Sequence, residues 1–207
     1  MDKPAVKYLS NIVVTGAFNP SIIQPAWLIS TGIVSPPSDD EEVSIKMPVV
    51  SPSLIFRFEI GEAKWTVATD RLILEPKKDK SVQALAISVL KKLPHTPLAA
   101  VGTNVESVIS QEVWQSNQSV ISKNLVDACS QIGTINEKNC ILRIDRGDDV
   151  ILTVNIMEVL EKVIFNMNFH QITHDLNSAQ HALSKYNQHI NDAKKIVNDL
   201  CGAMVQS

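Results

Sequence analysis

The segment from residue 176 to residue 204 constrains the fold more than any other part of this 207-residue chain. Its apolar residues recur at alternating steps of three and four, which is the pattern of an amphipathic α-helix. One continuous helix of this span measures roughly 40 Å, whereas a compact chain of this size has a radius of gyration of about 17 Å. The helix therefore needs a covering surface almost as long as the domain. The apolar positions are Leu176, Ala179, Leu183, Tyr186, Ile190, Ala193, Val197, Leu200 and Met204.

The surface that covers this apolar seam can belong to the same domain or to a partner. The positions flanking the seam carry no clear set of opposite charges, so an autonomous coiled coil is not favoured. Ala182, Ile196 and Ala203 widen the apolar stripe, as a helix resting on a sheet requires. We favour packing within the domain, and contact with another subunit or protein is the alternative. In that alternative the interacting residues are Leu183, Tyr186, Ile190, Val197 and Leu200.

The chain before this helix alternates strand patterns with helical ones. The sequence predicts strands at 6–18, 54–60, 65–69, 71–75, 98–102, 140–145, 150–156 and 163–169, and helices at 21–30, 81–93 and 103–133. The polar stretch 115–119 leaves open a division of the last segment into two helices. Thr103 and Glu106 have the spacing of a capping box, which places a helix start at Thr103. The expected fold class is α+β, in which antiparallel β-meanders alternate with helices and a long C-terminal amphipathic helix closes the chain.

A chain of this length can bury a core as one α+β domain, residues 1–207. Each predicted meander is followed by a helix, so two similar halves at about 1–103 and 104–207 are a second interpretation, without a residue-level repeat to support it. Residues 35–52 combine prolines with acids, which predicts a surface loop. In the simplest interpretation its acidic run is a solvated surface segment. In the alternative, the acidic run contacts a partner or binds a cation. The run is Asp39, Asp40, Glu41 and Glu42.

The sequence has no features of a membrane or secreted protein. No apolar run reaches the ~18 residues of a membrane-spanning helix, and residues 1–4 lack the basic-then-apolar pattern of a secretory signal. Cys129, Cys140 and Cys201 are an odd number without a close pair, which suits buried thiols in a reducing compartment. We therefore expect a soluble cytoplasmic protein that does not contact a membrane.

Basic residues are dispersed along a chain whose formal net charge is −3. Nucleic-acid binding without sequence preference needs several cations that converge on phosphates, often with aromatic side chains between them. Few aromatic residues lie near the best basic clusters, so weak nucleic-acid binding is a minor alternative. The clusters are Lys77, Lys78 and Lys80, followed by Lys91 and Lys92.

Local signatures of enzymes are absent from the sequence. No two of the seven glycines have the spacing of a phosphate-binding loop. The nucleophile elbow, the zinc-binding His-Glu-x-x-His pattern and the protein-kinase motifs are also missing. We therefore expect no cofactor and disfavour an enzyme, although a catalytic site assembled from distant residues stays open.

Two clusters of polar residues are candidate metal sites. His170, His174 and His181 would point the same way on a continuous helix, as a transition-metal site requires. The same helical count places His174 and His181 opposite the apolar seam, so a solvated face is the simpler interpretation. A second cluster, Asp145, Asp148 and Asp149, could offer oxygen ligands to Mg²⁺ or Ca²⁺, but aspartates are also common in turns.

These observations favour a non-enzymatic protein that takes part in protein–protein interaction or assembly and associates with itself. The interaction would use the closing helix, the acidic residues 39–42, or both. The alternatives are an enzyme or metal-binding protein with a convergent His or Asp site, and a weak nucleic-acid binder.

Overall fold

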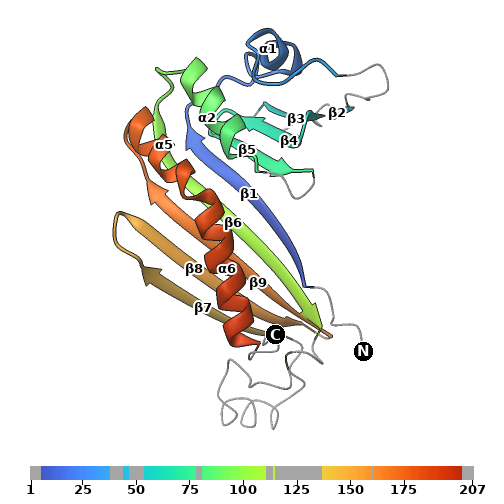
Figure 1. The fold of residues 1–207 in the computed structure, drawn as a ribbon, viewed down its shortest axis with the longest axis vertical. Helices are drawn as coiled ribbons and strands as arrows, with labels where there is room; N and C mark the ends of the chain where they lie inside the picture. The colour runs from blue at the N-terminus through green and yellow to red at the C-terminus, as the bar shows by residue number, and fades with distance from the viewer. Residues whose placement is uncertain are drawn as a thin grey trace. The chain divides into compact units, whose positions relative to one another are not determined.

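The computed structural model describes residues 6–37, 44–46, 54–77, 81–110, 114, 137–159 and 161–201. Within these ranges the fold is mixed α+β, as predicted (Figure 1). The strands are β1 (Lys7–Gly16), β2 (Ser44–Lys46), β3 (Ile55–Ile60), β4 (Ala63–Ala68), β5 (Arg71–Pro76), β6 (Leu98–Ser110), β7 (Glu137–Asp145), β8 (Val150–Val159) and β9 (Lys162–Ile172). Within the described ranges the helices are α1 (Pro25–Ser30), α2 (Gln83–Lys92), α5 (Leu176–Ser184) and α6 (Tyr186–Leu200).

The strands are hydrogen-bonded in the order β2-β3-β4-β5-β1-β6-β9-β8-β7. β3, β4 and β5 are consecutive both in the chain and in this order, and they pair antiparallel. β7 and β8 form an antiparallel hairpin, and β9 is the other neighbour of β8. This order agrees with the two predicted meanders.

The predicted helix beginning at Thr103 is wrong, because β6 continues as one strand to Ser110. Along its second half, buried residues alternate with half-buried ones, which is the period of a strand and not of a helix. Thr103 is itself buried and therefore does not begin a solvent-facing helix. Apart from Trp114, the rest of the predicted helix lies outside the described residues.

The predicted long C-terminal helix is divided at Lys185 into α5 and α6. The Ser184 hydroxyl donates a hydrogen bond to the carbonyl of His181 at 2.7 Å. The Lys185 amide donates to the carbonyl of Ala182 at 3.2 Å, which is a bond of 3₁₀ type. The Lys185 bond takes the place of the regular α-helical bond to residue 181, so the segment forms two helices and not the single helix predicted. Residues 202–207 lie outside the described part of the chain.

The predicted loop at 35–52 contains a short strand that sequence analysis missed. Ser44–Lys46 forms β2 and pairs antiparallel with β3. Residues 38–43 and 47–53 lie outside the described residues, and with them Asp39, Asp40, Glu41 and Glu42.

The chain packs into two compact units. The α2 unit consists of Ser10–Thr103 and His170–Asn187, and the α6 unit of Met1–Leu9, Asn104–Phe169 and Gln188–Ser207. A boundary between Thr103 and Asn104 coincides with the junction of the predicted halves, but each unit also includes a segment from the other half. A resemblance between the halves stays a prediction.

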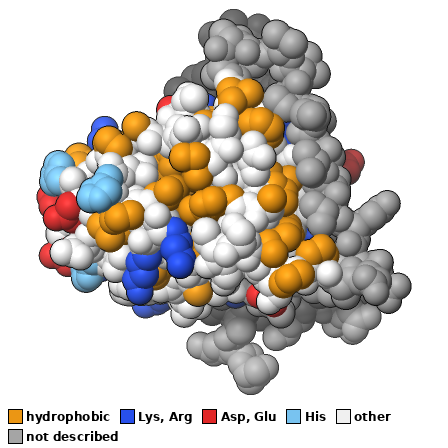
Figure 2. All heavy atoms as spheres, turned by 90° about the horizontal axis from the view of Figure 1, so that it is seen from above, with side chains coloured by type: hydrophobic (Ala, Val, Ile, Leu, Met, Phe, Trp, Pro, Cys, Tyr) orange, Lys and Arg blue, Asp and Glu red, His pale blue; other side chains and the backbone are white. Residues whose placement is uncertain are grey.

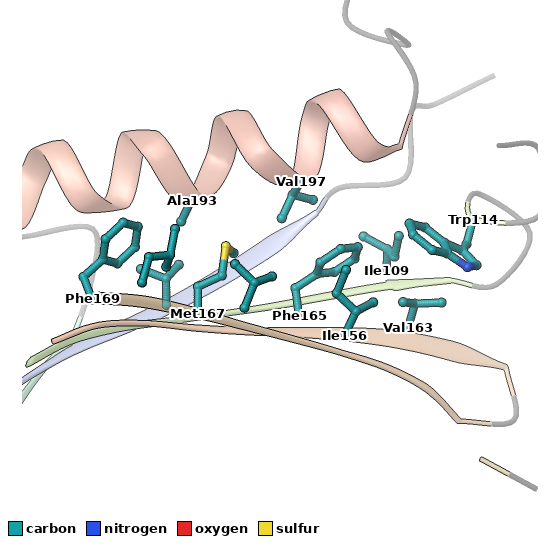
Figure 3. Close-up of a cluster of buried hydrophobic side chains, with 12 residues drawn as sticks. Ile109, Trp114, Ile156, Val163, Phe165, Met167, Phe169, Ala193 and Val197 are labelled. Carbon is teal, nitrogen blue, oxygen red and sulfur yellow. The ribbon is translucent and has the colours of Figure 1, made fainter. Parts of the chain in front are cut away.

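The α6 unit buries a core between α6 and strands β6, β8 and β9. Ala193 and Val197 point from α6 toward the strands (Figure 3). Trp114 meets Phe165 edge to face, with ring centroids 5.6 Å apart. The seam of α6 is therefore covered by strands of its own unit. The core residues are Val105, Ile109, Trp114, Leu152, Val154, Ile156, Val163, Phe165, Met167, Phe169, Ala193 and Val197.

The α2 unit has a core of its own, in which α2 contacts α5. Trp65 is buried and stacks against Phe58 with ring centroids 6.0 Å apart. The Tyr186 hydroxyl lies 2.8 Å from the Ser10 hydroxyl, which satisfies a polar group on a buried side chain. At Gly16 a side chain would collide with the Pro97 carbonyl, because a Cβ atom there would lie 2.4 Å from that oxygen.

Enlarging Ala193 tests the packing of α6. Ala193→Leu places extra methyl groups in a filled contact, so we expect a loss of about 1–3 kcal/mol in the free energy of unfolding. Asn191→Leu, at an exposed position on the same helix, is the control and should change it little. Urea unfolding measures both, and equal stability of the two variants would contradict the packing described.

Asp175 makes the stability of α5 depend on pH. Its carboxylate caps the helix by accepting a hydrogen bond from the Ser178 amide at 2.7 Å. The hydrogen bonds from Ser178 lower the pKa of Asp175, so the folded chain holds the charged form more strongly than the unfolded chain. The stabilisation is complete above the unfolded pKa and is lost as the pH falls through the folded pKa.

Asp175→Asn keeps an acceptor but does not titrate. We expect wild type to melt at a higher temperature than Asp175→Asn at neutral pH, and the difference to vanish at acidic pH. Melting curves across that range test this, and a difference that is independent of pH would exclude a contribution from the carboxylate charge.

Candidate interaction surface

β7 is an edge strand of nine residues. It pairs with β8 over its whole length, from Glu137 opposite Val159 to Asp145 opposite Ile151. β7 is the last strand in the order, so no described strand pairs with its other edge (Figure 1). An unpaired edge presents a row of backbone N–H and C=O groups that another strand can bind.

The backbone groups at the free edge of β7 belong to alternate residues. The Arg146 amide donates to the Val150 carbonyl at 3.0 Å, and this pair continues the register of β7 and β8. In an antiparallel pair, hydrogen-bonded residues alternate with non-hydrogen-bonded ones. The even-numbered residues of β7 therefore bond to β8. The residues that turn their N–H and C=O groups to the free edge are Glu137, Asn139, Ile141, Arg143 and Asp145.

β7 exposes aliphatic side chains on both faces. Ile141, Leu142 and Ile144 are 62%, 49% and 42% exposed. Leu142 and Ile144 lie opposite Val154 and Leu152, which belong to the core, so these two side chains are on the face that α6 covers elsewhere. Ile141 is on the other face. The apolar surface of the α6-facing side therefore continues to the edge of the sheet, and Ile141 adds one exposed aliphatic side chain on the other face.

Exposed hydrophobic side chains also occur elsewhere in the described residues. Figure 2 shows such side chains, in orange, among basic, acidic and histidine side chains on the face seen from above. Scattered exposed apolar residues are normal on proteins, whereas β7 concentrates three within four positions. The others are Leu9, Ile22, Leu54, Ile172 and Leu200.

The turn between β7 and β8 is attached to α6. Arg146 forms an ion pair with Asp192 of α6, with Nη1 and Oδ2 2.7 Å apart. The Arg146 guanidinium also lies over the Phe169 ring, 5.5 Å from its centroid. Gly147, Asp148 and Asp149 all have positive φ, and the Asp145 carboxylate accepts a hydrogen bond from the Gly147 amide at 2.9 Å. These contacts fix the position of the C-terminal end of β7.

A buried carboxylate attaches the other end of β7. Lys138 of β7 donates to Oε2 of Glu158 at 2.9 Å, and Trp114 Nε1 donates to Oε1 at 3.0 Å. Glu158 is 6% exposed, so its charge needs both partners. β7 is therefore attached near both ends by groups of the α6 unit.

The structure does not group the three predicted histidines as metal ligands. His170 is half-buried in β9, His174 is exposed in the link to α5, and His181 is exposed on α5. In the described part of the chain, no three His, Cys, Asp or Glu side chains are placed to hold a metal ion, and this includes the aspartates of the turn at 145–149. The buried His189, which sequence analysis treated only as a flanking position, stacks on Phe169 with ring centroids 4.4 Å apart.

The helix residues predicted to meet a partner are mostly covered by the chain itself. Leu183, Tyr186 and Val197 are buried, Ile190 packs partly buried against the core, and Leu200 is exposed. Sequence analysis did not single out β7 as a candidate interaction surface. One signal was present: Cys140 to Ile144 is largely apolar without alternation, which is typical of a strand covered on both faces.

No protein-family model matches the sequence, and no curated protein matches it. Among the described helices, none combines the length and the apolar character that crossing a bilayer requires.

Removing Lys138 tests the attachment of β7. Lys138→Met keeps the aliphatic stem but leaves Glu158 with one partner fewer, so we expect a loss of about 1–3 kcal/mol in the free energy of unfolding. Lys195→Met, at an exposed position on α6, is the matched control and should be nearly neutral. Chemical denaturation measures both, and a neutral Lys138→Met would show that water replaces the ammonium group.

Proposed function

We propose that this protein is a non-enzymatic interaction or assembly protein that associates through strand addition at β7. One observation carries the proposal: among the described strands, nine-residue β7 has a partner at only one of its edges, and it exposes Ile141, Leu142 and Ile144. An added strand would satisfy the backbone groups and cover aliphatic side chains on both faces.

β7 has few of the features by which proteins protect sheet edges, and three of its four charged residues lie at its ends: Glu137, Lys138 and Asp145. Protected edges are short, bulged, or carry prolines and charges. The opposite end of the strand order fits this rule, because β2 has three residues. β7 is three times as long, keeps an unbroken register with β8, contains no proline, and has only Arg143 as a charged residue between 139 and 144.

The energetic contribution of a second strand is modest for each group and large in sum. Covering a half-exposed Leu or Ile side chain contributes on the order of 1 kcal/mol. A backbone hydrogen bond adds about 1 kcal/mol when it replaces a bond to water. The five odd-numbered residues of β7 turn their backbone groups to the free edge, so both terms support association against the entropy that it costs.

The two alternative functions gain no support from the described residues. A metal-dependent enzyme would need grouped ligands, and the described histidines and turn aspartates are not grouped. For nucleic-acid binding, Lys77 is paired with Glu59 at 3.9 Å, and Lys91 and Lys92 lie at the end of α2. Lys78 and Lys80 lie outside the described residues.

A lysine in the middle of β7 tests the proposed function. Ile141→Lys places a charge at the free edge, so we expect the purified protein to lose concentration-dependent association. The matched control is Ile172→Lys, because Ile172 is 50% exposed at the end of β9, which has strands on both sides in the order. Light scattering over a concentration series measures the mass. A wild-type protein that stays monomeric and binds no strand-forming peptide would overturn the proposal.

A further inference from the structure

We propose that the strand added at β7 is β7 of a second copy, paired antiparallel so that Ile141 lies opposite Ile141 of the other copy. This inference rests on the proposed function and specifies its partner. Two copies of one strand related by a two-fold axis perpendicular to the sheet necessarily run antiparallel. The interface would then be self-complementary and would close with two chains.

Backbone bonding limits the registers that such a dimer can take. The free-edge groups belong to odd-numbered residues, so odd-numbered residues must lie opposite odd-numbered ones. Ile141 is the midpoint of Glu137–Asp145, and only the register centred on Ile141 pairs β7 over its full length. This register therefore forms the largest number of backbone hydrogen bonds between the two copies.

The side chains of β7 match this register. The most exposed aliphatic side chain, Ile141, would cover its own counterpart on one face. On the other face Leu142 would lie opposite Cys140, and Ile144 opposite the aliphatic stem of Lys138. Arg143 would lie opposite Asn139, and like charges meet only at the two ends of the ladder, where Glu137 would lie opposite Asp145.

Neighbouring registers fit less well. A shift in one direction places Lys138 opposite Arg146 and Ile141 opposite Arg143, which brings two cations together and leaves the isoleucine against a charge. A shift in the other direction places Ile141 opposite Asn139, Leu142 opposite Lys138, and Cys140 opposite itself. Both shifts also shorten the ladder. The apolar pattern and the length of the ladder thus favour the register centred on Ile141.

The strand order also favours a closed pair of chains. The two-fold contact uses β7 of both copies, so no β7 edge remains for a third chain. The other end of the order is β2, whose three residues give a further strand few backbone groups to bind. The expected product is a dimer and not a filament.

Cysteine cross-linking distinguishes the registers. In the proposed register Cys140 and the partner's residue at position 142 form a non-hydrogen-bonded pair, with Cα atoms about 4.5 Å apart. A disulfide spans Cα distances of about 4.4–6.8 Å, so Leu142→Cys should cross-link to Cys140 of the other copy. In this register wild type and Ile144→Cys should not cross-link through Cys140, because the nearest thiols lie diagonally, about 8 Å apart.

The experiment treats wild type, Leu142→Cys, Ile144→Cys and the double variant Cys140→Ser/Leu142→Cys with oxidised glutathione. Non-reducing gels then measure the loss of the monomer band. We expect a covalent dimer from Leu142→Cys alone, and its loss in the double variant. All three substituted positions are on the protein surface or partly exposed, and circular dichroism confirms that each variant is folded.

The outcomes separate this inference from the proposed function. A dimer by light scattering that cross-links in wild type, or in Ile144→Cys, places the copies in a shifted register and overturns the inference alone. A dimer that cross-links in no variant means that the two copies meet elsewhere, which overturns the inference as well. A monomer that binds an added strand-forming peptide at β7 supports the proposed function and excludes a second copy as the partner. A monomer that binds no peptide overturns both.

Discussion

The apolar contact between α6 and strands β6, β8 and β9 is the interaction on which the rest of the α6 unit depends. Ala193 lets the helix approach closely, and Val197, Phe165 and Met167 fill the space between the helix and the strands. Because this layer is filled, α6 offers a fixed position for Asp192, and Asp192 in turn holds Arg146 at the turn of the hairpin. The position of the C-terminal end of β7 thus depends on the packing of α6 against the sheet.

The surface of β7 reflects where this core ends. Core residues of β8 lie opposite Leu142 and Ile144, so the apolar face of the sheet extends one strand beyond the part that α6 covers. Polar groups are concentrated at the ends of β7, where Lys138 reaches the buried Glu158 and Arg146 reaches α6. The middle of the strand has only Arg143 to oppose contact with another chain. An apolar centre between polar ends is the usual composition of a protein interface.

Local pattern was sufficient to predict most of the elements. Alternation located β3, β8 and β9, and helical periodicity located α2 and both C-terminal helices. The failures came where two patterns overlap. Residues 103–110 satisfy a capping box and a helical count, but Val105, Ser107 and Ile109 also alternate, and pairing with neighbouring strands decided in favour of β6. The end of α5 depends on hydrogen bonds of Ser184 and Lys185, and the spacing of apolar residues gives no information about these bonds.

The candidate site was less accessible to sequence reasoning, because strand order cannot be read from a single strand. The segment 140–145 was predicted as a strand, and its aliphatic residues suggested burial. Only the order of strands shows that β7 has a neighbour on one side. The partners of Glu158 were equally hidden, since Trp114 is 44 residues away in the sequence and Lys138 is 20 residues away.

The turn that joins β7 to β8 has a consequence for how this sequence can diverge. Three successive residues, Gly147, Asp148 and Asp149, adopt the left-handed conformation, which glycine, asparagine and aspartate tolerate and β-branched residues do not. Substitutions at positions 148 and 149 can therefore change the charge of the turn, but only to a few residue types such as glycine and asparagine. In distantly related sequences, glycine, asparagine or aspartate should remain at these turn positions after the residues of the flanking strands have changed.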